Sequence, residues 1–195
     1  MEETVVPFVS PLDQLAPTTA IRGSLLLSSM QSLREHGLGD RYLELLPDEH
    51  RVALTTLVAG VWVPIEIGRV HYETCDRLGL GAHELNEIGA DVSRRVQGSL
   101  LSMLLKAAGV SLWTGLGQSR RLYERVFVGG GIEVVQLGPK DAGVTFGGFT
   151  LATIAYVRAG LRSILKASGE AFARTVVVKE MGWGSAQVSY RVSWA

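Results

Sequence analysis

The spacing of hydrophobic residues changes its period at the glycine run Gly129–Gly131. Before that run, apolar side chains recur every three or four residues, as they do along one face of a helix. After it, apolar and polar residues alternate, most regularly over Gln187–Trp194. Alternation with a period of two is typical of an antiparallel strand that buries one face. The sequence therefore predicts an α+β fold, with several N-terminal helices packed on a small antiparallel sheet.

The helical part of the chain carries start and stop signals. Glycines follow three of the apolar patterns, and glycine readily adopts the left-handed conformation that ends a helix. Serine and aspartate suit the N-terminal end of a helix, and proline suits its first turn. The expected helices begin at Ser24, Asp40, Asp48, Pro64, His83 and Ser111, with His83–Ala108 the longest and Ser111–Val126 the last.

Two C-terminal hairpins are expected to form most of the sheet. The first joins residues 132–137 to 144–146 through a turn rich in glycine and proline. The second joins residues 175–180 to 187–194. Between them, Thr150 is expected to cap a further helix.

The domain organisation is expected to be simple. A length of 195 residues suits one domain. Residues 1–20 contain three prolines, which predicts an N-terminal tail or a short pairing strand. Residues 21–195 show no linker and no internal repeat, so we expect a single α+β domain there.

Charge is balanced overall but not along the chain. The 19 basic and 19 acidic residues give a net charge of zero, which argues against a dedicated nucleic-acid binder. Residues 1–90 nevertheless carry a net −7 and residues 91–195 a net +7. Two interpretations stay open. Either the two halves pack together and their fields cancel, or an acidic face meets a basic face in an assembly.

The sequence points to a reduced compartment. The single cysteine, Cys75, excludes an intramolecular disulfide. The opening residues have neither the basic nor the apolar region of a secretory signal. Polar residues interrupt every apolar stretch well before the ~18 residues needed to cross a bilayer. We therefore expect a cytoplasmic protein without membrane insertion.

Candidate catalytic and metal-binding residues are few. His71 and Cys75 lie four residues apart on an expected helix, so a thiol beside an imidazole is one hypothesis for a nucleophile. Asp76, the nearest group that would orient the base, lies off that helical face. No two histidines stand at helical ligand spacing, and no glycine cluster fits a phosphate-binding loop. We therefore expect neither a catalytic nor a metal site, and not an enzyme.

Large apolar side chains remain as candidates for a binding site. Aromatic residues are needed for the core of a chain of this size, so core packing is one interpretation. The other is that some of them line an apolar pocket between the helices and the sheet. The candidate ligand-binding residues are Trp62, Met103, Trp113, Phe127, Phe146 and Tyr156.

The order of these features resembles an uncharacterised paralogous family that is expanded in myxobacteria. The similarity rests on the helix that starts at Gly23-Ser24-Leu25, the Trp62-x-Pro64 element, Tyr123 before a strand pair, and a last strand ending at Trp194. That family is similar in turn to the ligand-binding fold of 4-vinyl-reductase-type domains, haem nitric-oxide sensors and TRAPP vesicle-tethering subunits. The resemblance implies helices on an antiparallel sheet, often around an apolar pocket, and dimers.

The chain also departs from these relatives. Vinyl-reductase-type domains often carry cysteines around the last hairpin, and residues 181–189 contain none. Haem nitric-oxide sensors carry a Tyr-x-Ser-x-Arg motif for the haem propionates, and this chain has Ser189-Tyr190-Arg191 instead. We therefore expect no haem and no other cofactor.

Two functions follow as hypotheses. The first is a non-enzymatic sensory or regulatory module that forms a homodimer and holds a small apolar ligand. The second is a protein-interaction adaptor with a fully packed core, whose charge-polarised surface docks a regulatory protein partner.

Overall fold

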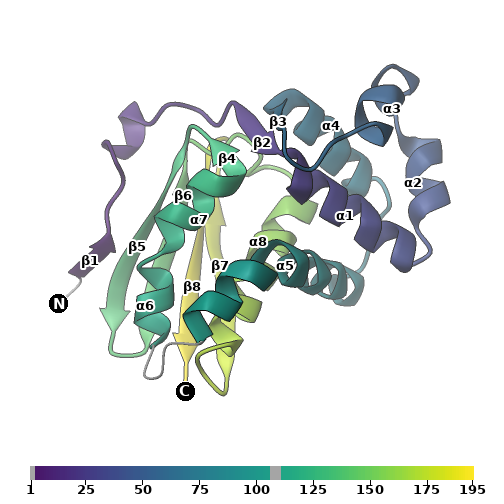
Figure 1. Ribbon diagram of the computed structural model, residues 1–195. Coiled ribbons are helices and arrows are strands. Elements are labelled where there is room, and N and C mark those ends of the chain that lie inside the picture. The colour runs from purple at the N-terminus through teal and green to yellow at the C-terminus, as the bar shows by residue number, and fades with distance from the viewer. Residues whose placement is uncertain (1–2, 106–110) are drawn as a thin grey trace.

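The computed structural model describes residues 3–105 and 111–195, with the side chains of residues 97–105 left out (Figure 1). In chain order the elements are β1 (Glu3–Val6), a 3-10 helix (Leu12–Gln14), β2 (Ala20–Arg22), α1 (Gly23–Glu35), α2 (Gly39–Leu45), α3 (Asp48–Thr55), β3 (Trp62–Pro64), α4 (Ile65–Asp76), α5 (Ala82–Leu105), α6 (Leu112–Leu116), α7 (Ser119–Val126), β4 (Phe127–Val128), β5 (Gly131–Gly138), β6 (Asp141–Gly147), α8 (Ala155–Glu170), β7 (Val176–Trp183) and β8 (Gln187–Trp194). This order confirms the predicted α+β class.

A five-stranded antiparallel sheet, in the order β1-β5-β6-β8-β7, forms one layer of the fold (Figure 1). The hairpins β5–β6 and β7–β8 supply four of its strands, as predicted, and β1 pairs with the outer edge of β5. Along β8 the side chains of Val188, Tyr190 and Val192 are buried. The alternating pattern of the last strand therefore marks the face that the helices cover.

Helices α7 and α8 lie against that covered face. The Tyr190 hydroxyl of β8 donates a hydrogen bond to the Arg158 carbonyl of α8 over 2.8 Å. The Tyr123 ring of α7 has its centroid 6.2 Å from that of Phe146 on β6. Helix α5 packs on α8 from the other side and also contacts α1. The core thus continues from the sheet into the space between these helices.

A second, small sheet in the order β3-β2-β4 closes another side of that space. Its inner face carries Ile21, Val63 and Phe127, all buried. Its outer face carries Trp62 and Val128, which are 40% and 42% exposed. Because residues on the two faces alternate, this sheet separates the core from solvent with a single layer.

The segment predicted as one helix over Ser111–Val126 is instead two helices, α6 and α7. The chain turns at Gly117, and the Ser119 hydroxyl donates to the Leu116 carbonyl over 2.6 Å. A Cβ atom at Gly115 would lie 3.1 Å from the Phe172 ring, so α6 packs closely on the segment after α8. The helical periodicity correctly predicts both α6 and α7, but it does not reveal the turn that separates them.

The predicted helix caps Ser24 and Thr150 are also wrong. Ser24 lies inside α1, which begins at Gly23. The Thr150 hydroxyl donates to the Thr18 carbonyl, and α8 begins five residues later. Asp76, at the end of α4, caps α8 instead: its carboxylate accepts hydrogen bonds from the amides of Ala155 (2.9 Å) and Tyr156 (2.6 Å).

We expect Asp76→Ala to lower the free energy of unfolding by about 1–2 kcal/mol, as loss of a helix cap does. The two amides at the start of α8 would lose their carboxylate partner, and a negative charge would leave the helix N-terminus. Asp76→Asn keeps one acceptor and is expected to lose less than half as much. Urea unfolding of both variants measures this difference. Equal losses would show that α8 does not depend on the carboxylate.

Candidate functional site

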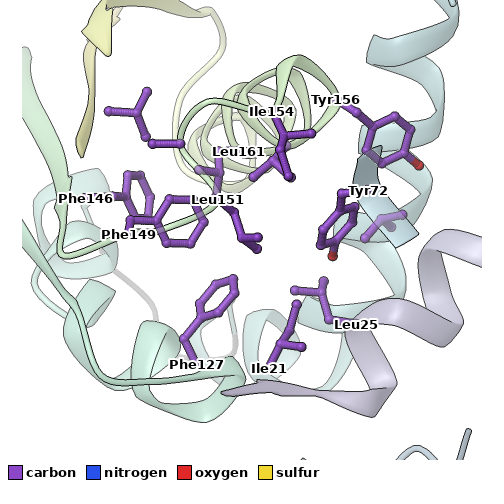
Figure 2. Close-up of a cluster of buried hydrophobic side chains, with 14 of the residues drawn as sticks. Ile21, Leu25, Tyr72, Phe127, Phe146, Phe149, Leu151, Ile154, Tyr156 and Leu161 are labelled. Atoms are coloured by element: carbon purple, nitrogen blue, oxygen red, sulfur yellow. The ribbon is translucent and has the colours of Figure 1, made fainter. Parts of the chain in front are cut away.

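A small apolar cavity of about 50 Å³ lies where α1, α4, α5 and α8 meet the inner side of β4 (Figure 2). Each of these elements turns apolar side chains toward it. The loop before α8 contributes Leu151 to its wall, and this residue is fully buried. The apolar lining includes Leu25, Val92, Phe127, Leu151, Val157 and Leu161.

Glycines let the two longest helices approach each other beside this cavity. A Cβ atom at Gly89 of α5 would lie 2.6 Å from the Cβ of Ser163 on α8, which is closer than packed atoms allow. A Cβ atom at Gly160 of α8 would have no atom within 4 Å. The crossing is therefore tight on one side of Gly160 and open on the other, where the cavity lies.

A chain of buried hydrogen bonds borders the cavity. The Tyr156 hydroxyl and the Ser29 hydroxyl are 2.9 Å apart, and Ser29 lies 2.9 Å from Nε2 of His71. Nδ1 of His71 is 2.8 Å from the Tyr42 hydroxyl. His71 is completely buried, so both of its ring nitrogens are paired inside the protein. Ser29 and Tyr156 also contribute to the cavity lining.

Burial keeps this cluster uncharged. It lowers the pKa of His71 to about 3, because the imidazolium form loses its hydration. Burial likewise raises the pKa of the Cys75 thiol, whose sulfur lies 3.8 Å from Nε2 of His71. A reactive cysteine needs its thiolate form, so this pair lacks the charge state of an activated nucleophile. Asp76, the third candidate group, is the cap of α8.

The structure brings two of the sequence candidates into the cavity wall, Phe127 and Tyr156. Phe146 lies one aromatic layer away, with its ring 5.9 Å from that of Phe149. Phe149 in turn makes an edge contact with Phe127 at 5.2 Å. These rings form the core between the sheet and the cavity (Figure 2).

Two of the other candidates, Trp62 and Trp113, lie elsewhere. Trp62 is on the outer face of the small sheet, with the Arg22 guanidinium 3.9 Å from its ring. Trp113 makes an edge contact with Trp194 and donates to the Pro139 carbonyl over 3.0 Å. Met103 falls among the residues whose side chains are outside the described part of the chain.

Sequence reasoning missed the helical residues of the wall, notably Leu25, Ser29, Tyr72 and Gly160. Leu25, Ser29 and Tyr72 are residue types that are common on the buried face of a helix, so nothing in the sequence sets them apart. Gly160 is the one with a signal, because glycine inside a helix is unfavourable and often has a packing reason.

The described residues contain neither a membrane-spanning helix nor a cluster of metal-binding side chains. None of the helices there is long and apolar enough to cross a membrane. Within the same residues, no three histidine, cysteine, aspartate or glutamate side chains gather in a way that would hold a metal ion.

Comparison with solved structures places this arrangement among known folds. An H-NOX domain studied for the function of haem distortion is 13% identical, with 89% of this chain and 95% of that chain covered and a TM-score of 0.59. The chain has the H-NOX fold. An oxygen-binding H-NOX domain related to soluble guanylate cyclases is 12% identical, with 89% and 95% covered and a TM-score of 0.57. A point mutant of the T. tengcongensis H-NOX is also 12% identical, with 89% and 97% covered and a TM-score of 0.58.

No family model matches the sequence, and no curated protein matches it either. The similarity to solved H-NOX structures confirms the predicted resemblance to haem nitric-oxide sensors at the level of the fold. The resemblance to a myxobacterial paralogous family stays a prediction.

A haem group does not fit the described residues. Pockets for larger organic ligands measure about 300–1,000 Å³, and this cavity measures about 50 Å³. Haem iron is held by histidine, cysteine thiolate, methionine or tyrosine, and the described lining has no histidine, cysteine or methionine. Burial raises the pKa of the lining tyrosines Tyr72 and Tyr156, which keeps them protonated. Within the described residues, this fold is thus combined with a cavity lining that does not fit haem.

Matched glycine substitutions test the packing around the cavity. Gly160→Ala adds a methyl group in open space and replaces a poor helix former, so we expect a gain of about 0.5–1 kcal/mol in unfolding free energy. Gly89→Ala forces its methyl group into Ser163, and we expect a loss of about 1–3 kcal/mol. Thermal or urea unfolding measures both. Changes of the same sign would contradict the described α5–α8 contact.

Proposed function

We propose that this chain is a non-enzymatic sensory or regulatory module that binds a small, uncharged, largely apolar molecule in the α1–α4–α5–α8 cavity and works as a homodimer. The observation that carries this proposal is the cavity itself, an apolar space left open at the meeting point of four helices. An occupant there touches elements from both halves of the chain. Its presence would therefore change how the helices pack on one another.

Two further findings support the proposal. Solved structures with the same fold include an oxygen-binding domain related to soluble guanylate cyclases, which is a precedent for a small ligand. The neutral, buried state of His71 and Cys75 supports a role without covalent catalysis.

Cavity size limits the ligand to a few heavy atoms. The cavity has about a third of the ~150 Å³ volume in which an engineered protein cavity binds benzene. Small ligands gain at most about 1.5 kcal/mol per heavy atom, so four atoms correspond to a Kd of about 40 μM or weaker. A module with this affinity responds to abundant small molecules and releases them quickly.

Native mass spectrometry of the full chain tests the proposal. We expect a dimer mass. Because a ligand of this size is released quickly, we also expect acetone added at millimolar concentration to shift the NMR signals of the wild-type protein but not those of a Leu161→Trp variant, whose larger side chain would fill the cavity. A bare monomer in both proteins would contradict the proposal. Dissociation of a bare dimer by added salt would favour the adaptor alternative, because salt screens exposed charges.

A further inference from the structure

Tyr72 of α4 brings a polar group to the cavity that no described residue satisfies. Its side chain is 6% exposed and belongs to the lining. Figure 2 shows its ring directed toward Leu25, with the hydroxyl oxygen at the end nearest that residue. None of the described residues forms a hydrogen bond with this hydroxyl. The hydroxyl oxygen is not fully enclosed, since the described buried polar atoms that lack a partner are Nδ1 of His50 and Nε of Arg158. It therefore borders open space, as expected of a group in the cavity lining.

The hydroxyl groups of Ser29 and Tyr156, which also line the cavity, do have hydrogen-bond partners. Ser29 lies between Tyr156 and His71, at 2.9 Å from each, so its hydrogen-bonding capacity is largely used. Tyr156 is engaged with Ser29, and its hydroxyl points away from the apolar cluster in Figure 2. Tyr72 is therefore the described tyrosine of the lining whose hydroxyl is available to an occupant.

We propose that Tyr72 is the ligand-recognition residue, and that the ligand is a small neutral molecule with one hydrogen-bond acceptor and an otherwise apolar body, such as a short ketone or aldehyde. This inference rests on the proposed function and names its ligand class. The Tyr72 hydroxyl donates to the acceptor atom, and Leu25, Leu151 and Phe127 surround the apolar remainder.

Water is a poorer occupant than such a ligand. The volume of about 50 Å³ is enough for a water molecule. A buried water, however, normally makes two to four hydrogen bonds, and this cavity offers one unpaired hydroxyl among apolar side chains. A ligand with a single acceptor satisfies Tyr72 and leaves no polar group of its own unpaired. Charged ligands are excluded, because the described lining holds no charged side chain that would pair with them.

Acetone and 2-methylpropene are suitable probes, since they share one heavy-atom skeleton and differ in the acceptor oxygen. Their Kd values are to be measured on the full chain by NMR, from the methyl shifts of Leu25, Leu151 and Val157. The readout is the ratio of the two Kd values, which cancels general effects on the cavity. We expect Tyr72→Phe to reduce the preference for acetone by about 2- to 10-fold, as loss of one net hydrogen bond does.

Tyr123→Phe is the matched control. Its hydroxyl is also buried, at 3.0 Å from the Thr18 hydroxyl, but lies outside the cavity lining. We expect this variant to leave the ratio unchanged. Binding of both probes with the same ratio in wild type and Tyr72→Phe would overturn the role of Tyr72 while the proposed function stands. Failure of both probes to bind wild type would overturn the proposed function as well.

Discussion

Leu151→Ala is expected to lower the free energy of unfolding by about 3–5 kcal/mol and to let the protein bind benzene. Leu151 is completely buried and lies in the cavity wall. Its truncation removes buried apolar contacts and leaves empty volume, which are the two costs of a large-to-small substitution in a core. The enlarged cavity would approach the size that holds benzene in other proteins. Benzene should then restore part of the lost stability by mass action.

Leu33→Ala is the control for this prediction. Leu33 is also completely buried, but it lies outside the cavity lining. We expect a comparable loss of stability without rescue by benzene. Urea unfolding of both variants with and without benzene makes the comparison. Equal rescue of the two variants would show that the space beside Leu151 is not a distinct binding site.

Acid should destabilise the protein through His71. The pKa of its imidazole is about 3 in the folded state and 6.5 as the ordinary value. Between pH 6.5 and 3 the unfolded chain therefore binds a proton that the folded chain does not. Stability then falls as pH falls, by about 1.4 kcal/mol per pH unit in that window. At pH 4.5 the effect of His71 alone is expected to make the free energy of unfolding about 2–3 kcal/mol lower than at pH 7.

The contribution of His71 can be separated from that of the carboxylates. His71→Gln keeps polar atoms near Ser29 and Tyr42 but cannot become charged. We expect it to be less stable than wild type at pH 7, and to lose about 2–3 kcal/mol less than wild type between pH 7 and pH 4.5. Urea titrations at both pH values give the two differences. The same acid loss in both proteins would mean that His71 binds its proton in the folded state.

The predictable parts of the fold depend on neighbours in sequence. The alternation over Gln187–Trp194 gave both the last strand and its buried face, because a strand places every second side chain on one side. The wrong cap of α8 has the opposite origin. Its true cap, Asp76, is 79 residues from Ala155, and no local pattern connects the two.

The cavity was predictable only in part for the same reason. Phe127 and Tyr156 stand out as large aromatic residues next to expected elements, and both lie in the wall. Trp62 stands out equally but faces solvent, because β3 places it on the outer side of a one-layer sheet. The role proposed for Tyr72 could not be predicted from the sequence, because it depends on where the unpaired hydroxyl lies relative to α1 and the loop before α8.

Diffraction from crystals pressurised with xenon would show directly whether the α1–α4–α5–α8 cavity admits an apolar occupant. Xenon is apolar and enters dry cavities of suitable size in protein cores. We expect one xenon atom among Leu25, Val157 and Leu161, and none there in Leu161→Trp. Absence of xenon from that space in the wild-type protein would contradict a ligand-accessible cavity, and with it the function proposed for this fold.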